Sequence, residues 1–323
     1  MCQGQERITK FIRSNDMNVI RTIVNAYPLS LREAAVLIQT APARYKVHQI
    51  EKRHGRGTRT IAQPTAEIKL LQKLLVREVI EKLPVNDAAK AYRSGQSIAD
   101  HARPHASNRF LLKLDFKDFF PSIRGADFLK HLHKHSEIGT EDSKHLVKLF
   151  FWRPRGTRSL VLSIGAPSSP AISNTIMFDF DSALSDFCTR EHVVYTRYAD
   201  DLAFSTNGPE VLHRVHEHVI NLCRTLKYPR LTLNDAKTVY TSKKHHRSLT
   251  GLVLSNDGKA SLGREKKRQL RAMVHRLKYD LLNQEERAKL KGWIAFALSI
   301  DEEFVRSLKR IMGDQTFESL MRG

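Results

Sequence analysis

Cysteine and long apolar runs are both scarce in this chain. The three cysteines among 323 residues, Cys2, Cys188 and Cys223, show no C-x-x-C spacing. Neither a disulfide framework nor a cysteine-rich zinc site is therefore supported. No apolar run approaches the roughly 20 residues of a membrane span, and the polar residues 1–15 carry no signal-peptide pattern. These absences predict a cytoplasmic protein that does not cross a membrane.

Acidic residues are few compared with basic ones. The chain has 34 Asp and Glu against 54 Lys and Arg, which gives a formal net charge of +20 and a pI near 10.0. Such an excess indicates a polyanionic partner, and nucleic acid fits better than an anionic membrane surface. The hydrophobic fraction of 41% is enough for a core in about two domains or one multi-lobed domain.

Two adjacent carboxylates, Asp200 and Asp201, stand between runs rich in β-branched and aromatic residues, 193–198 and 202–205. These runs predict a β-hairpin with the acidic pair at its tip. Ala-Asp is a poor turn dipeptide, so the tip is interpreted as serving chemistry. Neighbouring carboxylates repel each other unless a cation lies between them, and magnesium takes such oxygen ligands. The alternative is a solvated acidic turn.

A third carboxylate, Asp115, ends an apolar strand that begins at Arg109, and a turn is expected before Pro121. A strand-end aspartate beside the acidic pair can hold two metal ions about 3.5 to 4 Å apart. That spacing stabilises the attacking and leaving oxygens of nucleotidyl transfer. Many strand ends carry an aspartate, so Asp115 alone does not establish a metal site.

Basic side chains supply further candidates. Arg59 lies in a basic hairpin over 45–64, where its guanidinium can hold phosphate oxygens in a bidentate fork. Lys237 is a candidate proton donor to a leaving pyrophosphate. A solvated loop and a surface lysine are the alternatives. Small residues over 163–170 predict a loop that lets the backbone approach a base or sugar closely, before a helix near 171–184.

Helical patterns flank these motifs. Within residues 1–45, Pro28 separates two expected helices, and Ser30 with Glu33 forms a capping box. Another amphipathic helix is predicted over 65–83, with a buried stripe. That stripe consists of Ile68, Leu71, Leu75 and Val79.

Histidines recur at short spacings. His101 and His105 could share a helix face, but Pro104 disfavours a helical conformation at the residue before it. A structural role is therefore favoured over metal ligation. The same interpretation covers two further groups, namely His131, His133 and His135, and His213, His216 and His218.

A strongly basic helix is predicted over 264–278, where seven Lys or Arg accompany one Glu. Such a surface can neutralise several phosphates, and binding would then weaken steeply with salt. A merely solvated helix face is the alternative. The apolar residues 292–300 are expected to pack this end against the rest of the chain.

The ordered set of motifs resembles the reverse transcriptase family over about residues 45–300. Residues 114–123 resemble the first palm motif, 198–201 the Y-x-D-D box, and 165–170 the loop between them. Residues 59–64 look like the fingers segment, and Lys237 matches the lysine of the motif after the box. The resemblance implies an α+β right-hand polymerase fold with fingers, palm and thumb, preceded by N-terminal helices.

The resemblance also implies a division of the chain. The expected parts are an N-terminal helical segment at 1–45, fingers at 46–108, a palm at 109–255 and a helical thumb at 256–323. Part of the fingers would be inserted near 135–165.

By resemblance, the catalytic residues are Asp115, Asp200, Asp201 and Lys237, and the three aspartates hold two Mg²⁺ ions. The implied substrate-binding residues are Arg59 on the triphosphate, Phe120, Gly165 and Tyr198. Phe120 matches the bulky aromatic that excludes a 2′-hydroxyl, which implies deoxynucleotide substrates. Ile164 stands where the family usually has glutamine, so the contact of that amide is absent or replaced.

The chain looks most like the bacterial retron type. The N-A-x-x-H motif of that type reads His-Ala-Arg-Pro-His at 101–105, and its V-T-G motif reads Leu-Thr-Gly at 249–251. Each differs at its first position, His101 and Leu249. The expected nucleic-acid-binding residues are His105, Thr250, Gly251, Arg264, Lys267, Arg268 and Arg271. Only roughly 40 residues follow the basic helix, too few for an RNase H, maturase or endonuclease domain.

Retron membership implies a cognate structured non-coding RNA as template and primer, with synthesis from the 2′-hydroxyl of an internal guanosine. The product would be branched multicopy single-stranded DNA trimmed by a host RNase H, in a phage-defence system with a separate effector protein. Another compact bacterial reverse transcriptase, group II-like or diversity-generating, is the nearest alternative. An RNA-binding protein with a silent polymerase site is a further one, which the three aspartates, Arg59 and Lys237 disfavour.

Overall fold

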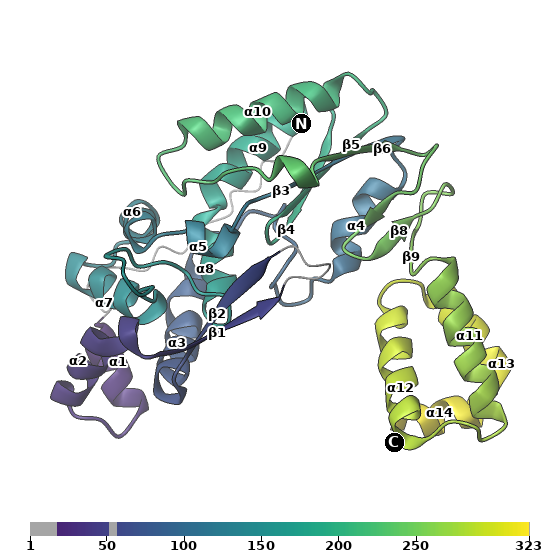
Figure 1. The fold of residues 1–323 in the computed structure, drawn as a ribbon, viewed down its shortest axis with the longest axis horizontal. Coiled ribbons are helices and arrows are strands. Elements are labelled where there is room, and N and C mark those ends of the chain that lie inside the picture. Colours follow the sequence, from purple (N-terminus) through teal and green to yellow (C-terminus); the bar gives the residue numbers. More distant parts are fainter. Residues whose placement is uncertain (1–17, 52–56, 323) are drawn as a thin grey trace, which may run out of the picture.

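The computed structural model describes residues 18–51 and 57–322. The polar N-terminal stretch, Cys2 and the basic turn at 52–56 lie outside these residues. Figure 1 shows one body built around a sheet, and a helical group formed by α11, α12, α13 and α14 beside it. The mixed α+β class expected from the sequence is confirmed. None of the helices in the described ranges combines the length and apolarity of a membrane span.

A four-stranded antiparallel sheet lies at the centre of the larger body, in the order β4-β5-β3-β6. Its strands are β3 (Phe110–Asp115), β4 (Val194–Tyr198), β5 (Asp201–Thr206) and β6 (Val239–Ser242). Because successive side chains point to opposite faces of a strand, the sheet joins two hydrophobic cores. Leu112 and Phe204 lie in the first core, whereas Leu111 and Ala203 lie in the second.

The first core unites the N-terminal helices with the face of the sheet covered by α9 (Phe178–Arg190) and α10 (Val211–Thr225). Other elements of this body are α1 (Val19–Ala26), α2 (Leu31–Thr40), η1 (Ala41–Ala43), β1 (Tyr45–Glu51), β2 (Thr58–Pro64), α3 (Ala66–Glu78), η3 (Ile80–Lys82), α5 (Phe119–Ser122), α6 (Gly125–His135), α7 (Thr140–Phe150), α8 (Ser169–Ile176) and η4 (Asp235–Lys237). Strands β1 and β2 form the expected hairpin.

Several local predictions are confirmed. Two N-terminal helices flank Pro28, and the Ser30–Glu33 capping box is present. The predicted stripe of the third helix is buried, although α3 ends at Glu78 and a 3-10 turn follows. The single helix expected near 171–184 is instead two helices, α8 and α9, which meet at Met177.

The second core joins the helical group to α4 (Ile98–Ala106) and a small sheet. That sheet contains β7 (Ser248–Leu249), β8 (Leu252–Leu254) and β9 (Ala260–Ser261), and the helices are α11 (Arg264–Lys278), α12 (Gln284–Leu298), α13 (Glu302–Met312) and α14 (Asp314–Arg322). The fully buried Arg247 donates hydrogen bonds to the carbonyls of Ala106 and Asn108 and to that of Ser255. This guanidinium therefore ties the end of α4 to the small sheet.

The expectation that Pro104 would prevent a helix at His101 and His105 is wrong, because α4 runs through it. Proline lacks a backbone N–H, so the helix loses only the one hydrogen bond that residue 104 would donate to the carbonyl of residue 100. A capping box of Ser97 and Asp100 fixes the other end, and Ala102 is among the residues buried along the helix.

Candidate active site

The predicted acidic hairpin is confirmed. Strands β4 and β5 are joined by the two-residue turn of Ala199 and Asp200, and Tyr198 lies opposite Asp201. Ala199 has a φ of 57°, a left-handed conformation that such turns usually assign to glycine. The Phe116 N–H donates to the Asp200 carbonyl at 3.1 Å. The strained turn is thus bonded to the residue that follows β3.

Asp115 lies directly opposite Asp201 in the register of β3 and β5. Side chains in such cross-strand pairs lie on one face, with their Cβ atoms about 4.5–5.5 Å apart. Sequence spacing alone left open whether Asp115 meets the acidic pair, and this register brings them together. Three carboxylates from two distant chain segments therefore converge at one end of the sheet.

The carboxylates repel one another. Desolvation, followed by the charge of Asp115, raises the pKa of Asp200. Asp201 is exposed, yet desolvation and then the charges of Asp200 and Asp115 raise its pKa to about 7. Negative charge at this end of the sheet is therefore incompletely compensated by the protein.

Lys237 supplies part of that compensation. Its Nζ atom donates to both carboxylate oxygens of Asp115, at 2.9 and 2.8 Å, from the 3-10 turn η4. The Asn234 side-chain amide reaches the same carboxylate at 3.4 Å. Lys237 thus lies within the acidic site, as the sequence predicts, and its part in proton transfer stays a prediction.

The donor set suits a hard divalent cation. No group of three or more His, Cys, Asp or Glu side chains in the described ranges could hold a metal ion as it stands. The chemistry nevertheless fits Mg²⁺, which prefers oxygen ligands. The raised pKa values of Asp200 and Asp201 mark the charge that such a cation would neutralise.

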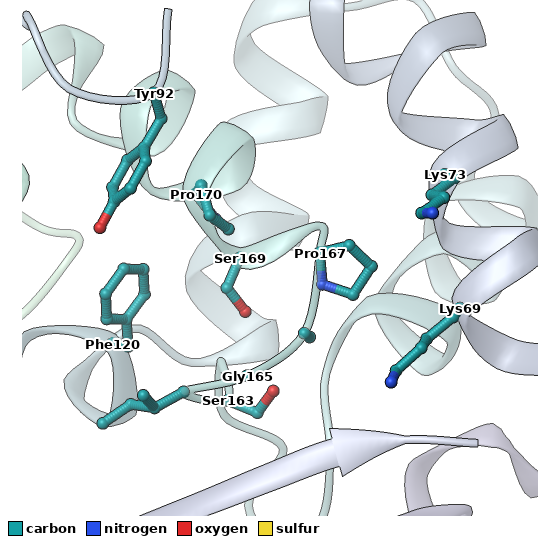
Figure 2. Close-up of a pocket in the computed structure, with 11 residues that line it drawn as sticks. Lys69, Lys73, Tyr92, Phe120, Ser163, Gly165, Pro167, Ser169 and Pro170 are labelled. Atoms are coloured by element: carbon teal, nitrogen blue, oxygen red, sulfur yellow. The ribbon is translucent and has the colours of Figure 1, made fainter. Parts of the chain in front are cut away.

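A cavity of about 430 Å³ contains two of the predicted substrate-binding residues, Phe120 and Gly165. Figure 2 shows the hydroxyl of Tyr92 pointing toward the Phe120 ring, with Lys69 and Lys73 projecting from α3 at the other side. The cavity therefore has an aromatic end and a basic end.

The loop at 163–170 forms one wall of this cavity. The φ of Gly165 is +116°, and an added Cβ atom would lie 3.1 Å from the Ile61 side chain and 3.2 Å from that of Gln63. The Ala62 N–H donates to the Ile164 carbonyl at 2.9 Å. Glycine thus allows the loop to pack on β2, whereas the predicted close approach of this loop to a base or sugar stays a prediction. Ile164 gives the cavity an apolar lining where the family has an amide.

Arg59 lies on β2 and is exposed. Desolvation is the main cause of the raised pKa of Asp200 and of Tyr92, and the positive charge of Arg59 opposes both rises. Arg59 therefore lies within electrostatic reach of both the acidic site and the cavity. Tyr92, Lys69 and Lys73 were not predicted as site residues. The two lysines are four residues apart on α3, a spacing that puts them on one helix face, whereas nothing local to Tyr92 marks it.

His105, which the sequence analysis expects to bind nucleic acid, is buried in this structure. Its side chain is 0% exposed, with Nδ1 2.8 Å from the Ser205 hydroxyl and Nε2 2.7 Å from that of Thr196. His101 Nδ1 lies 2.7 Å from the same Thr196 hydroxyl, and its ring is 5.7 Å from that of Tyr198. In this structure His105 therefore presents no surface to nucleic acid. Both histidines instead contact hydroxyl groups on the strands of the acidic hairpin, His105 on β4 and β5 and His101 on β4.

The predicted basic helix is confirmed as α11, with the same bounds. Lys267 is not free for phosphate, because its Nζ atom lies 2.5 Å from Asp301 and 5.0 Å from the Phe304 ring centre. Arg264 and Arg268 are exposed. Arg271 is also exposed, although its guanidinium lies over Phe304, 5.2 Å from the ring centre. Arg264 and Arg268 are therefore the two of the four predicted basic residues of α11 for which no ion pair or ring contact with α13 is seen among the described residues.

The turn between β7 and β8 holds Thr250 and Gly251, both with positive φ, at 46° and 85°. The Thr250 hydroxyl is buried and has no hydrogen-bond partner among the described residues. Leu249, which departs from the family motif, is a buried core residue. That departure therefore lies in the second core.

Carboxylates that converge at one end of an antiparallel sheet, beside a cavity with an aromatic end and a basic end, are typical of the palm of a nucleotidyl-transferring polymerase. A family model described as reverse transcriptase (RNA-dependent DNA polymerase) matches residues 50–256. The Retron Ec83 reverse transcriptase of Escherichia coli is 39% identical over 310 residues, 95% of this chain and 98% of that one. The Retron Ec86 reverse transcriptase of E. coli is 30% identical, covering 90% and 88%. The chain belongs to the reverse transcriptase family and is of the retron type.

A solved structure supports the fold. Apo telomerase from Candida tropicalis aligns with a TM-score of 0.51 at 13% sequence identity, covering 86% of this chain and 57% of that one. The right-hand polymerase fold expected from the sequence is therefore confirmed, and so is the expected RNA-directed DNA polymerase activity.

Replacing Arg264 and Arg268 together with Gln is expected to weaken RNA binding and reduce its salt dependence. Each lost phosphate contact should lower the slope of log K against log salt by about one unit. Filter binding or anisotropy at several salt concentrations measures this slope. The matched control is Arg306→Gln with Arg310→Gln on α13, which removes equal charge. An unchanged slope in the α11 variant would remove that helix from the RNA interface.

Proposed function

We propose that this retron-type reverse transcriptase copies a cognate structured non-coding RNA, starting from the 2′-hydroxyl of an internal guanosine. The product is branched multicopy single-stranded DNA. The observation that carries the proposal is the likeness to retron reverse transcriptases over nearly the whole chain, 39% identity across 95% of it. Host RNase H trimming, a cytoplasmic location and a phage-defence role with a separate effector protein belong to the same proposal.

The acidic site supports the chemistry of this proposal. Asp115, Asp200 and Asp201 would hold two Mg²⁺ ions, which when bound lower the pKa of the priming hydroxyl and stabilise the charge on the leaving pyrophosphate. No protein base is then required. Lys237, whose ammonium group lies against Asp115, holds a proton beside the site and is the proposed donor to the pyrophosphate.

The cavity and Arg59 orient the incoming deoxynucleotide in this proposal. The guanidinium of Arg59 binds triphosphate oxygens, for which its planar fork is suited. The Phe120 ring stands at the aromatic end of the cavity, facing Tyr92. A ribose 2′-hydroxyl would meet that ring, whereas a deoxyribose would not. Gly165 keeps the opposing loop backbone close to the nucleotide, and Tyr198 adjoins the turn.

Phe120→Val is expected to relax the selection against ribonucleotides. Overfilling a packed site costs about 1–3 kcal/mol, so removing the clash should raise ribonucleotide kcat/KM about 10- to 100-fold relative to deoxynucleotides. Single-nucleotide incorporation with each substrate measures the ratio. Phe187→Val on α9, outside the cavity, is the matched control. A ratio equal in all three proteins would show that Phe120 does not select the sugar.

The whole proposal is tested by the nucleic acid that the protein carries in its host. The full chain and an Asp200→Asn/Asp201→Asn control are purified, and the bound nucleic acid is sequenced before and after RNase and debranching treatment. Single-stranded DNA joined to RNA through a debranching-sensitive 2′ linkage, absent from the control, is expected. Linear complementary DNA would instead favour a group II-like or diversity-generating enzyme. RNA alone in both samples would favour a silent RNA-binding protein.

A further inference from the structure

Arg197 is a buried cation in the first strand of the acidic hairpin. It precedes Tyr198 on β4, and its side chain is 0% exposed. Its Nε atom donates to Asp181 Oδ1 at 2.9 Å and its Nη2 atom to Oδ2 at 2.6 Å, from β4 to α9. The Tyr195 hydroxyl donates to the same Oδ1 at 2.8 Å. The Asp181 carboxylate is thus fully engaged and holds the guanidinium in one orientation.

The remaining donor group of Arg197 points to the turn formed by Ala199 and Asp200. Its Nη1 atom donates to the Ala199 carbonyl at 3.1 Å, and Asn174 Oδ1 lies 3.4 Å from Nη1. The Ala199 carbonyl belongs to the peptide that joins Ala199 to Asp200. Because Ala199 is left-handed, at a φ of 57°, this peptide is held in an orientation that alanine alone disfavours.

The same guanidinium is connected to the nucleotide cavity. Asn174 on α8 donates through Nδ2 to the Ala91 carbonyl at 2.7 Å, immediately before the cavity residue Tyr92. The backbone of Arg197 also accepts from Lys90 N–H at 2.8 Å and donates to the Ala88 carbonyl at 2.7 Å. One side chain and its own backbone therefore join the turn, α8, α9 and the segment that leads to Tyr92.

We infer that Arg197 is a positioning residue: held by Asp181, it fixes the peptide before Asp200 and so sets where the Asp200 carboxylate lies relative to Asp115. Stability alone does not explain such a pair, since well-packed apolar residues can replace buried ion pairs without loss. An apolar pair cannot donate to the Ala199 carbonyl. Lysine would keep the charge, but its ammonium lacks the planar fork that serves Asp181 and the turn together.

The inference rests on the proposed role of Asp200 as a metal ligand, and two variants test it. Arg197→Lys keeps the charge and removes the fork. The triple variant Arg197→Met/Asp181→Leu/Tyr195→Phe replaces the network with apolar groups, leaving no charge or hydroxyl stranded. Arg190→Lys, an exposed change near the end of α9, is the matched control. Urea unfolding establishes that each variant is folded.

Two readouts separate positioning from folding. Mn²⁺ titration of the free, full-length protein, followed by electron paramagnetic resonance, gives metal affinity without any reaction. Extension of an oligo(dT) primer on poly(rA) gives kcat and the KM for dTTP without the retron priming step. Groups that orient metal ligands typically change affinity or activity about 10- to 100-fold when mutated. We expect losses of that size in Mn²⁺ affinity and in kcat for both variants, with the KM changed less than kcat.

The outcomes are distinguishable. Wild-type Mn²⁺ affinity and kcat in the folded triple variant would overturn the inference. If Arg197→Lys alone failed to fold, the triple variant would still decide, because it leaves no buried charge. If the unmodified protein made no DNA, the proposed function would fail, while the Mn²⁺ titration would still decide whether Arg197 positions the carboxylates.

Discussion

Asp200→Asn is expected to lower DNA synthesis by about 1,000-fold or more while the protein stays folded and keeps its RNA. Charge stabilisation by a catalytic metal amounts to several kcal/mol, and each 1.36 kcal/mol is a tenfold change in rate. Asparagine keeps the shape of the side chain and removes the charge that the metal requires. Primer extension measures the loss, and filter binding measures RNA retention.

Although Asp200→Asn should lose activity, its thermal stability should rise. Because desolvation and Asp115 raise the pKa of Asp200 in the fold, its ionised form is disfavoured there, and a neutral replacement relieves that repulsion. Without divalent metal, Asp200→Asn is therefore expected to melt at a higher temperature than the parent. The matched control is Asp186→Asn, an exposed change on α9, which should leave both properties unchanged. Wild-type synthesis by Asp200→Asn would refute the acidic site.

Between pH 8 and pH 5 the free energy of unfolding is expected to fall by about 6 kcal/mol through three buried histidines. Burial lowers the pKa of His101 and of His131 to about 3, and that of His105 well below its ordinary value. The unfolded chain takes up these protons near pH 6.5 and the folded chain does not. Stability is therefore complete above about pH 6.5 and is lost as the pH falls toward 3, by about 2 kcal/mol per histidine at pH 5.

Asp201 acts in the opposite sense. Its pKa of about 7 means that the folded protein binds a proton that the unfolded chain releases, so stability from this group rises as the pH falls from 7 toward 4. Asp200, whose pKa is also raised, acts in the same sense, so the double variant Asp200→Asn/Asp201→Asn removes both contributions and leaves that of the histidines. Urea unfolding of that variant from pH 8 to pH 5 measures the expected decline.

A histidine variant tests whether the buried histidines cause the fall in the free energy of unfolding between pH 8 and pH 5. Adding His131→Asn should reduce the pH slope by about one proton, because His131 packs against Thr175 with no exposed surface. Adding the exposed His133→Asn on the same helix should leave the slope unchanged. Equal slopes in the two proteins would mean that His131 is protonated in the folded state.

The sequence predicts the local parts of the site better than the contacts between them. Runs rich in β-branched and aromatic residues on both sides of the acidic pair predict the hairpin, and the apolar run before Asp115 predicts its strand, because both signals are local to their segments. The exact register that sets Asp115 opposite Asp201 comes from long-range pairing. No local pattern reports such pairing.

The features that the sequence analysis missed also depend on contacts between distant segments. A proline rule argued against the helix at His105, but buried side chains and a capping box outweighed it. A run of positive charge predicted α11 correctly without indicating that Lys267 faces Asp301. The Arg197–Asp181 pair joins β4 to α9, and neither residue stands out in its own segment. Tertiary context decides each of these contacts.

The bond between Arg247 and the end of α4 has a consequence for biosynthesis. Arg247 donates to the carbonyl of Ala106, 141 positions earlier in the chain, and the alanine face of α4 packs in the core completed by the last helices. A ribosome adding about 5–20 residues per second reaches Arg247 roughly 7–28 seconds after Ala106, and the last helices follow later still. Until the residues of the second core have been synthesised, α4 therefore lacks the side chains that cover its alanine face in the folded protein.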